Sequence, residues 1–187
     1  MNLSATFNVL RLFFSPHLCV PQMTINSFGQ LPVPIGPKIK AVVLDKDNCF
    51  AFPHENKVWP EYEELWQKLK NTYPGASMLI VSNSAGSSDD SGHAEALLLE
   101  KVTGVPVLRH SSKKPGCRDQ ILEHFYREKV IESPQEIAVV GDRLFTDILM
   151  ANLMGSYPVW VKEGVKLCES PICRFEKILL EWLRPEK

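Results

Sequence analysis

Several side chains that could do chemistry stand directly after short apolar runs of the sequence. Two carboxylic acids, Asp45 and Asp47, follow the run AVVL, and two more, Asp142 and Asp147, come after the run IAVVG. Taken singly, each has an ordinary explanation, because an acid or a serine after a strand usually caps a helix or faces solvent. Two acidic clusters after two apolar runs favour a shared metal ion instead. The candidate site residues are Asp45, Asp47, Ser82, Asn83, Lys114, Asp142 and Asp147.

This set suits the transfer of a phosphoryl group. A phosphate monoester is dianionic near neutral pH, so an attacking carboxylate needs positive charge beside it. Mg²⁺ prefers oxygen ligands and keeps several waters, so two or three carboxylates suffice, and Asp45 and Asp142 would supply them. Lys114 would neutralise further charge, while Ser82 and Asn83 would orient the phosphoryl oxygens together with nearby backbone amides. Mg²⁺ is therefore the expected cofactor.

The Asp-x-Asp spacing has a geometric reason. Side chains two positions apart in extended backbone point the same way, so both acids can reach one phosphate. With Asp45 as the nucleophile, Asp47 can protonate the leaving oxygen and later deprotonate the water that hydrolyses the aspartyl phosphate. One pair of acids then serves both half-reactions.

Apolar runs alternate with segments of helical periodicity over residues 41–161. The alternation predicts an α/β fold with a mostly parallel sheet and helices on both faces. Ligands in such folds bind beyond the carboxyl ends of strands, where the candidate residues stand. The connections leave room for helices but not for a large cap domain. The expected strands are residues 41–44, 78–81, 105–108, 137–140 and 157–161, and the expected helices are residues 60–70, 92–102, 144–154 and a segment that opens at Pro115.

The length fits one α/β domain with terminal extensions. We predict an N-terminal amphipathic helix and proline-rich arm over residues 1–37, a catalytic domain over 38–165 and a C-terminal amphipathic helix over 166–187. The arm is expected to be extended and without regular structure, because prolines recur through it. These are Pro16, Pro21, Pro32, Pro34 and Pro37.

Each terminal helix has two interpretations. The N-terminal one, with Leu3, Phe7, Leu10 and Phe14 at helical spacing, either packs on the domain or contacts a membrane surface, with or without a role in import. The C-terminal stripe indicates core packing or a dimer contact, with membrane docking as the alternative. It consists of Ile172, Phe175, Ile178, Leu179, Trp182 and Leu183.

Composition narrows the classes of function. The 21 basic and 22 acidic residues nearly cancel, which argues against a nucleic-acid partner. The five cysteines are odd in number and scattered, without the spacing of a zinc site or a disulfide framework, which favours a reducing compartment. No apolar run approaches the roughly 20 residues that a membrane-spanning helix needs.

The ordered motifs resemble those of the haloacid-dehalogenase-like superfamily over roughly residues 40–165. The resemblance implies a Rossmann-like sheet and a magnesium-dependent phosphatase. It also implies that the Asp47 backbone carbonyl ligates the metal and that Asp147 binds it through water or supports the site. Asn48 and Cys49 depart from the pattern of many members, which carry a threonine or a small apolar residue there. The matching residues are Asp45-Lys46-Asp47, Ser82, Lys114-Pro115 and Gly141-Asp142 with Asp147.

A closer resemblance runs from the LPVP segment to about Gly164. The strings VVLDKDNC, WPEY, LIVSNSAG, GVPVLRHSSKKPGC and AVVGDRLFTDILMANLMGSYPVWV are similar to the mitochondrial phosphatidylglycerophosphatase family of fungi. The resemblance implies removal of the terminal phosphate of phosphatidylglycerophosphate, an anionic phospholipid, on the way to cardiolipin. It also implies a peripheral enzyme on the matrix face of the inner mitochondrial membrane. An uncapped site could approach a phosphate that projects from a bilayer.

The head group of this lipid carries a phosphodiester beside the scissile phosphate, so additional cations would help to bind it. By their proximity to the motifs, Lys46, Arg109, Lys113 and Arg143 are candidates, although each could equally be a solvated or helix-pairing charge. Two other functions remain open: a phosphatase for a soluble phosphomonoester or a phosphoprotein, and a binding or scaffold protein that keeps the fold without catalysis.

Overall fold

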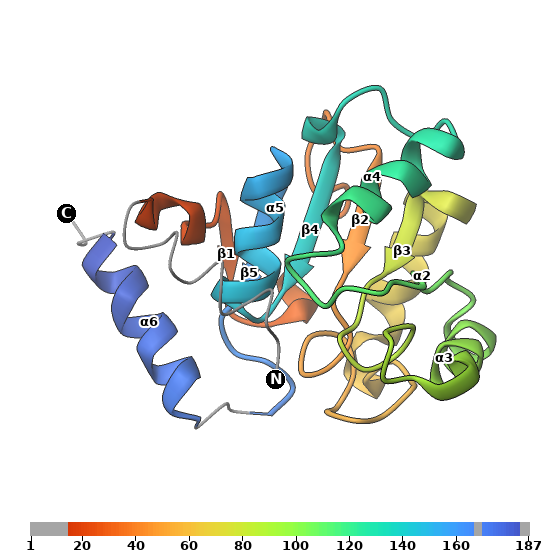
Figure 1. The fold of residues 1–187 in the computed structure, drawn as a ribbon, viewed down its shortest axis with the longest axis horizontal. Coiled ribbons are helices and arrows are strands. Elements are labelled where there is room, and N and C mark those ends of the chain that lie inside the picture. Colours follow the sequence, from red (N-terminus) through yellow and green to blue (C-terminus); the bar gives the residue numbers. More distant parts are fainter. Residues whose placement is uncertain (1–14, 167–169, 184–187) are drawn as a thin grey trace.

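A computed structural model describes residues 15–166 and 170–183. They contain a five-stranded sheet in the order β1-β5-β4-β2-β3, in which every pairing is parallel (Figure 1). This order sets β2 and β4 side by side and confirms the expected parallel α/β fold. The strands are β1 (Met23–Ile25), β2 (Ala41–Leu44), β3 (Met78–Ile80), β4 (Ile137–Gly141) and β5 (Tyr157–Val161).

Helices cover both faces of the sheet (Figure 1). In β2, Val42 and Leu44 face a core that includes residues of α2 and α3, while Ala41 and Val43 face a second core with α4 and α5. Burial on both faces explains why β2 reads as a continuous apolar run rather than an alternating one. The helices are α2 (Glu63–Thr72), α3 (Ala94–Thr103), α4 (Arg118–Arg127), α5 (Leu149–Met154) and α6 (Pro171–Leu183).

Short helical turns join these elements. A π-helix, η7 (Leu144–Ile148), starts the segment expected as one helix over residues 144–154. The strand expected over residues 105–108 forms only an isolated bridge between Val107 and Ile80. Proline at position 106 has no N–H to extend that pairing. The 3₁₀ turns are η1 (Pro16–Cys19), η2 (Phe28–Gln30), η3 (Pro60–Tyr62), η4 (Gly75–Ser77), η5 (Ser91–His93) and η6 (Pro134–Glu136).

The proline-rich segment before β2 differs from its prediction. It was expected to lack regular structure, but it contains β1, which pairs with β5 in the register Met23 to Val159. Phe28, Leu31 and Ile35 then enter the core of the domain. An edge strand tolerates flanking prolines because one of its sides needs no partner. The N-terminal amphipathic helix expected for the first fifteen residues lies almost wholly outside the described residues.

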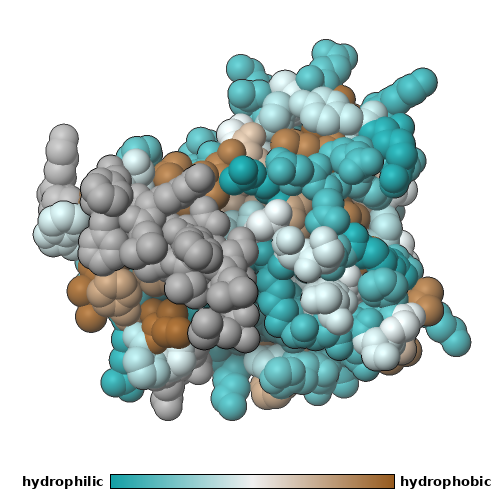
Figure 2. Space-filling model, viewed as in Figure 1, coloured by the Kyte–Doolittle hydropathy of each residue, from teal (hydrophilic) through white to brown (hydrophobic). Residues whose placement is uncertain are grey.

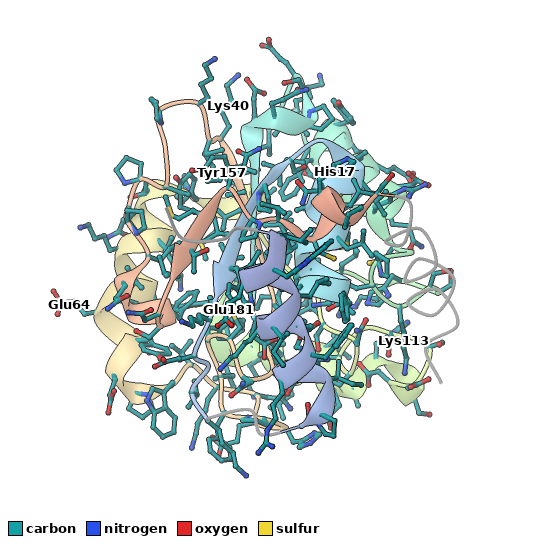
Figure 3. The ribbon with its side chains drawn as sticks, turned by 90° about the vertical axis from the view of Figure 1, so that its left-hand side faces the viewer. His17, Lys40, Glu64, Lys113, Tyr157 and Glu181 are labelled. Carbon is teal, nitrogen blue, oxygen red and sulfur yellow. The ribbon has the colours of Figure 1, made fainter. Side chains whose placement is uncertain are left out.

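Helix α6 packs on the edge of the domain beside η1, η7 and β5, and Figure 3 brings it to the front. Its Glu176 is buried, and Leu179 and Leu180 pack against an apolar cluster that includes Trp160. Cys173 is disulfide-bonded, which the scattered cysteine spacing did not predict, because one isolated bond needs no framework of paired cysteines. Among the described residues, no helix combines the length and apolar character that crossing a bilayer requires.

Candidate active site

The loops that follow β2 and β4 meet at the carboxyl edge of the sheet. Leu44 lies opposite Val140, and the Asp45 N–H continues the pairing by donating to the Val140 carbonyl oxygen at 2.9 Å. Neighbouring strands are only about 4.8 Å apart, so the residues that follow them are brought together. A pocket of about 480 Å³ opens at this edge. It is lined by Asp45, Asp47, Asn48, Pro53, His54, Asn83, Lys114, Asp142, Arg143, Thr146, Asp147, Lys166 and Ser170.

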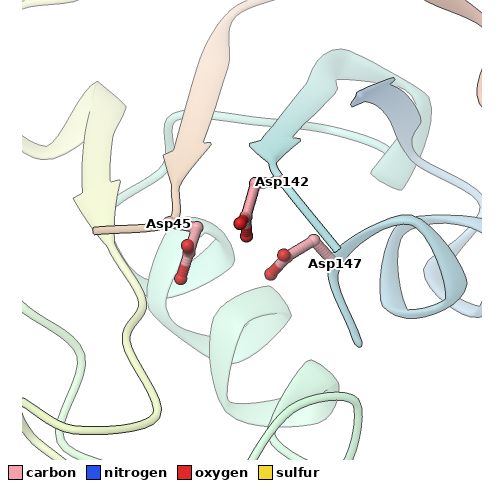
Figure 4. Close-up of side chains that lie close together, drawn as sticks. All are labelled: Asp45, Asp142 and Asp147. Carbon is pink, nitrogen blue, oxygen red and sulfur yellow. The ribbon is translucent and has the colours of Figure 1, made fainter. Parts of the chain in front are cut away.

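Three of the predicted acids converge in this pocket (Figure 4). Asp45, Asp142 and Asp147 each offer a carboxylate oxygen within 4.8 Å of the others. The π-helix η7 turns Asp147 back toward the strand end, where its carboxylate accepts the Arg143 N–H at 3.2 Å. A Cβ at Gly141 would collide with the Asp147 side chain, so glycine permits this close approach. Asp45 and Asp142 therefore face each other across the end of the sheet.

Lys114 lies at the inner end of the pocket with only 2% of its surface exposed. Its ammonium donates to Asp45 and, at 2.6 Å, to Oδ1 of Asp147. The Asn83 amide oxygen accepts the Lys114 backbone N–H at 2.8 Å, so Asn83 helps to hold this lysine in place. Burial lowers the pKa of Lys114, but the two carboxylates outweigh it and raise the pKa above its ordinary value.

The charge balance in the acid cluster favours a bound cation. Burial raises the pKa of Asp45 to about 7, because the lowering effect of Lys114 is partly cancelled by Asp147. Burial, followed by repulsion from Asp45 and Asp147, raises the pKa of Asp142 well above its usual range. A divalent cation would offset this repulsion, and a donor set made only of carboxylate oxygens fits Mg²⁺.

Asp47 occupies a different environment two residues after Asp45. Its Oδ1 accepts the His54 N–H at 2.8 Å and the Lys46 ammonium at 2.6 Å, and its Oδ2 accepts the Ser84 hydroxyl at 2.7 Å. Burial raises the pKa of Asp47, but these donors, led by Lys46, lower it below its usual value overall. The pKa of Asp45 is therefore raised and that of Asp47 is lowered, although the two acids are only two positions apart.

Ser82 is fully buried and does not line the pocket. Its hydroxyl oxygen accepts the N–H groups of Ser84 and Ala85 at 3.1 and 3.3 Å, and it lies 3.4 Å from Asp47. Ser82 therefore shapes the turn that presents Ser84. Sequence reasoning missed Ser84, although the string SNS placed a second hydroxyl two residues after the first.

The four residues predicted to bind the lipid head group lie in different parts of the structure. Arg143 lines the pocket. Lys46 is almost buried and donates to Asp47 and to the Glu55 carbonyl oxygen. Arg109 pairs with Glu100 and lines a separate pocket. Lys113 pairs with Asp89. Among the four candidate cations, only Arg143 lines the acidic pocket.

Asn48 and Lys166 are two of the polar pocket-lining residues that were not predicted, and they contact each other. Asn48 donates through Nδ2 to Asp142 at 3.2 Å, and its Oδ1 accepts the Lys166 N–H at 2.8 Å. It has a left-handed φ of 62°, a conformation that asparagine tolerates better than most residues. The unusual residue after Asp47 was visible in the sequence, but its contact with a loop more than a hundred positions away was not.

The parallel sheet and the acidic pocket at its carboxyl edge fit the haloacid-dehalogenase-like class of α/β proteins. A family model described as mitochondrial PGP phosphatase matches residues 3–166. The mitochondrial phosphatidylglycerophosphatase of Saccharomyces cerevisiae is 57% identical over 183 residues, which is 98% of this chain and 99% of that protein. The chain belongs to the mitochondrial PGP phosphatase family.

Two other relatives are less similar in sequence and are matched over part of their length. A probable mitochondrial phosphatidylglycerophosphatase of Schizosaccharomyces pombe is 33% identical over 81% of this chain and 78% of that protein. The chloroplastic/mitochondrial phosphatidylglycerophosphate phosphatase of Arabidopsis thaliana is 33% identical over 93% of this chain and 49% of that protein.

Proposed function

We propose that this chain is a magnesium-dependent phosphatase that converts phosphatidylglycerophosphate to phosphatidylglycerol, a step toward cardiolipin, at the matrix face of the inner mitochondrial membrane. The observation that carries the chemistry is the convergence of Asp45, Asp142 and Asp147 beside Lys114. The lipid substrate and the mitochondrial location rest on the names of the relatives.

The cation site would be formed by the carboxylates of Asp45 and Asp142, with the Asp47 backbone carbonyl as a further ligand and Asp147 bound directly or through water. Mg²⁺ there would neutralise charge on the phosphoryl oxygens as the attacking carboxylate approaches. Lys114 would add a fixed positive charge beside Asp45, where its ammonium already contacts the carboxylate.

Asp45 would attack the phosphorus atom, so that one carboxylate oxygen forms the new O–P bond and the bond to the glycerol oxygen breaks. Asp47 would give its proton to that leaving oxygen and later take one from the water that cleaves the aspartyl phosphate. Its lowered pKa suits the second role in the free protein. For the first role, the incoming anionic phosphate must raise the pKa of Asp47.

Membrane contact is the second part of the proposal. Helix α6 exposes Ile172, Phe175, Ile178 and Trp182, the last with 72% of its surface accessible. Figure 2 shows brown side chains at the lower left, where Figure 1 places α6. The opposite face of α6 packs on the domain, so this stripe is free to enter the interfacial region of an anionic bilayer. Ser170, just before α6, lines the pocket, which places the start of the helix beside the site.

Phosphate release tests the proposal directly. Purified protein would be assayed with phosphatidylglycerophosphate in vesicles and with soluble phosphomonoesters and phosphopeptides, each with Mg²⁺ and with a chelator. We expect Mg²⁺-dependent release with the highest kcat/KM for the vesicle-borne lipid. A preference for soluble esters would remove the lipid assignment. No release from any ester would favour a binding or scaffold protein that keeps the fold.

A further inference from the structure

The pocket is lined by cations that the proposed phosphoryl chemistry does not use. Its volume of about 480 Å³ is in the range of sites that hold whole small molecules rather than a single phosphate. Asp45, Lys114, Asp142 and Asp147 form the inner end. Arg143 and Lys166 are the other pocket-lining cations, and they come from the loops after β4 and β5.

Lys166 is held in position through its backbone. Its N–H donates to the Asn48 side chain at 2.8 Å, and the neighbouring Val165 N–H donates to the Asn48 carbonyl oxygen at 3.3 Å. A Cβ at Gly164 would collide with Asn48, so glycine lets this loop lie directly against the Asp-x-Asp motif. The Lys166 side chain is exposed, and the structure gives its ammonium no ionic partner among the described residues.

Arg143 is held through its side chain. Its Nε donates to Glu176 of α6 at 3.0 Å, and the same carboxylate accepts the Phe145 N–H at 3.0 Å. Glu176 is 2% exposed, so this tie is protected from solvent. One buried carboxylate thereby fixes both the guanidinium and the loop that leads to Asp147. This bond uses Nε, which leaves the two terminal nitrogens of the guanidinium as further donors.

We propose that Arg143 and Lys166 form a second anion subsite, which takes the phosphodiester of the substrate while its terminal phosphate lies at Asp45. This inference rests on the proposed function. The inner cation Lys114 is already shared between Asp45 and Asp147, so a third substrate charge needs other partners. The subsite supplies them from loops that are supported by Asn48 and Glu176. It would distinguish this lipid head group from monoesters that lack a phosphodiester.

A pair of soluble substrates tests the subsite without a membrane. The deacylated head group, glycerophosphoglycerol phosphate, carries both phosphates, and glycerol 3-phosphate carries only the terminal one. In the full-length protein, Lys166→Met should raise KM for the deacylated head group roughly tenfold, the usual worth of one charge-assisted hydrogen bond, with kcat unchanged. The same variant should leave kcat/KM for glycerol 3-phosphate unchanged, which also shows that it folds.

Lys162→Met is the matched control, because Lys162 is an exposed lysine at the start of the same loop that does not line this pocket. It should leave both substrates unaffected. The subsite is overturned if Lys166→Met changes both substrates equally or neither, or if Lys162→Met has the same effect. If the wild-type protein releases phosphate from vesicle-borne phosphatidylglycerophosphate but Lys166→Met has no effect, the subsite alone fails. If the wild type acts on neither the lipid nor its head group, the proposed function and the subsite fail together.

Discussion

The inner end and the rim of the pocket are built in different ways. At the inner end, Asp45, Lys114 and Asp147 are at most 8% exposed. Asp45 directly follows β2, Asp147 lies in η7 after β4, and Lys114 lies in the loop before α4. At the rim, the Arg143 side chain is 33% exposed and Lys166 is exposed, and both depend on loops and on α6 for support. Under the proposed mechanism, buried residues beside the sheet edge make and break bonds, while exposed loop residues supported by α6 select the substrate.

The two regions also differ in burial, and burial determines how much stability is lost when one of their charged residues is replaced. Charges taken out of water are costly unless they are paired, and removing one partner of a buried pair typically destabilises a protein by about 3–5 kcal/mol. Exposed ion pairs contribute at most about 1 kcal/mol. Substitutions at the inner end should therefore act on both catalysis and stability, whereas substitutions at the rim should act mainly on KM and vesicle binding.

The largest effect is expected for Asp45→Asn. It removes the nucleophilic oxygen, so kcat should fall by about 10⁴-fold or more with phosphatidylglycerophosphate. The shape of the side chain is kept, so circular dichroism should report a native fold. Asp89→Asn is a matched control, since Asp89 is an exposed acid that pairs with Lys113 and does not line the pocket. Near-normal turnover by the Asp45→Asn variant would exclude Asp45 as the nucleophile.

Removal of the metal is expected to have the second-largest effect. A chelator should reduce turnover by roughly 10³-fold, because charge neutralisation beside the phosphoryl group is lost. Mg²⁺ at ten times its Kd should stabilise the wild type by about 1.4 kcal/mol in thermal unfolding.

Asp142→Asn provides the sharper comparison. It should weaken this Mg²⁺ stabilisation, yet in chelator it should unfold no earlier than the wild type, because the repulsion that raises the pKa of Asp142 is gone. Equal stabilisation of the wild type and Asp142→Asn by Mg²⁺ would place the ion elsewhere.

The exposed stripe of α6 should have an intermediate effect. Replacing Ile178 and Trp182 with serine should lower the vesicle-bound fraction in sedimentation at least roughly tenfold, because these side chains would enter the bilayer interface. Hydrolysis of glycerol 3-phosphate should not change. Leu97→Ser with Val102→Ser is a matched control on α3, where both side chains are also more than half exposed. Equal losses from both helices would contradict a specific role of α6.

The smallest effect is expected for Glu176→Gln. The amide still accepts the Phe145 N–H but no longer pairs with the Arg143 charge. As a positioning residue, Glu176 should change the ratio of KM values for glycerol 3-phosphate and the deacylated head group by about threefold, a fraction of a charge-assisted bond. Equal changes for both substrates would indicate a purely structural role.

Sequence reasoning anticipated the inner end of the pocket better than the rim. Asp45 and Asp142 follow short apolar runs that were predicted as buried strands, and parallel pairing brings the ends of such strands together. The contacts of Asn48 with Lys166 and of Glu176 with Arg143 join positions far apart in the chain. These contacts depend on how the loops fold onto the sheet, which no local sequence pattern predicts.

Two other features escaped prediction for related reasons. Strand β1 has three residues between prolines, too few for a periodic signal, and its partner β5 lies more than a hundred residues away. The hydroxyl of Ser84, rather than that of Ser82, contacts Asp47 most closely, because the first serine is turned inward to hold its own turn.

The most direct test of the central claim is mass spectrometry of protein quenched in acid during turnover of phosphatidylglycerophosphate with Mg²⁺. If Asp45 attacks phosphorus, the peptide that contains it will carry one phosphoryl group, and the Asp45→Asn protein will carry none. Turnover without any phosphorylated protein, or with the group on a residue other than Asp45, would contradict the account.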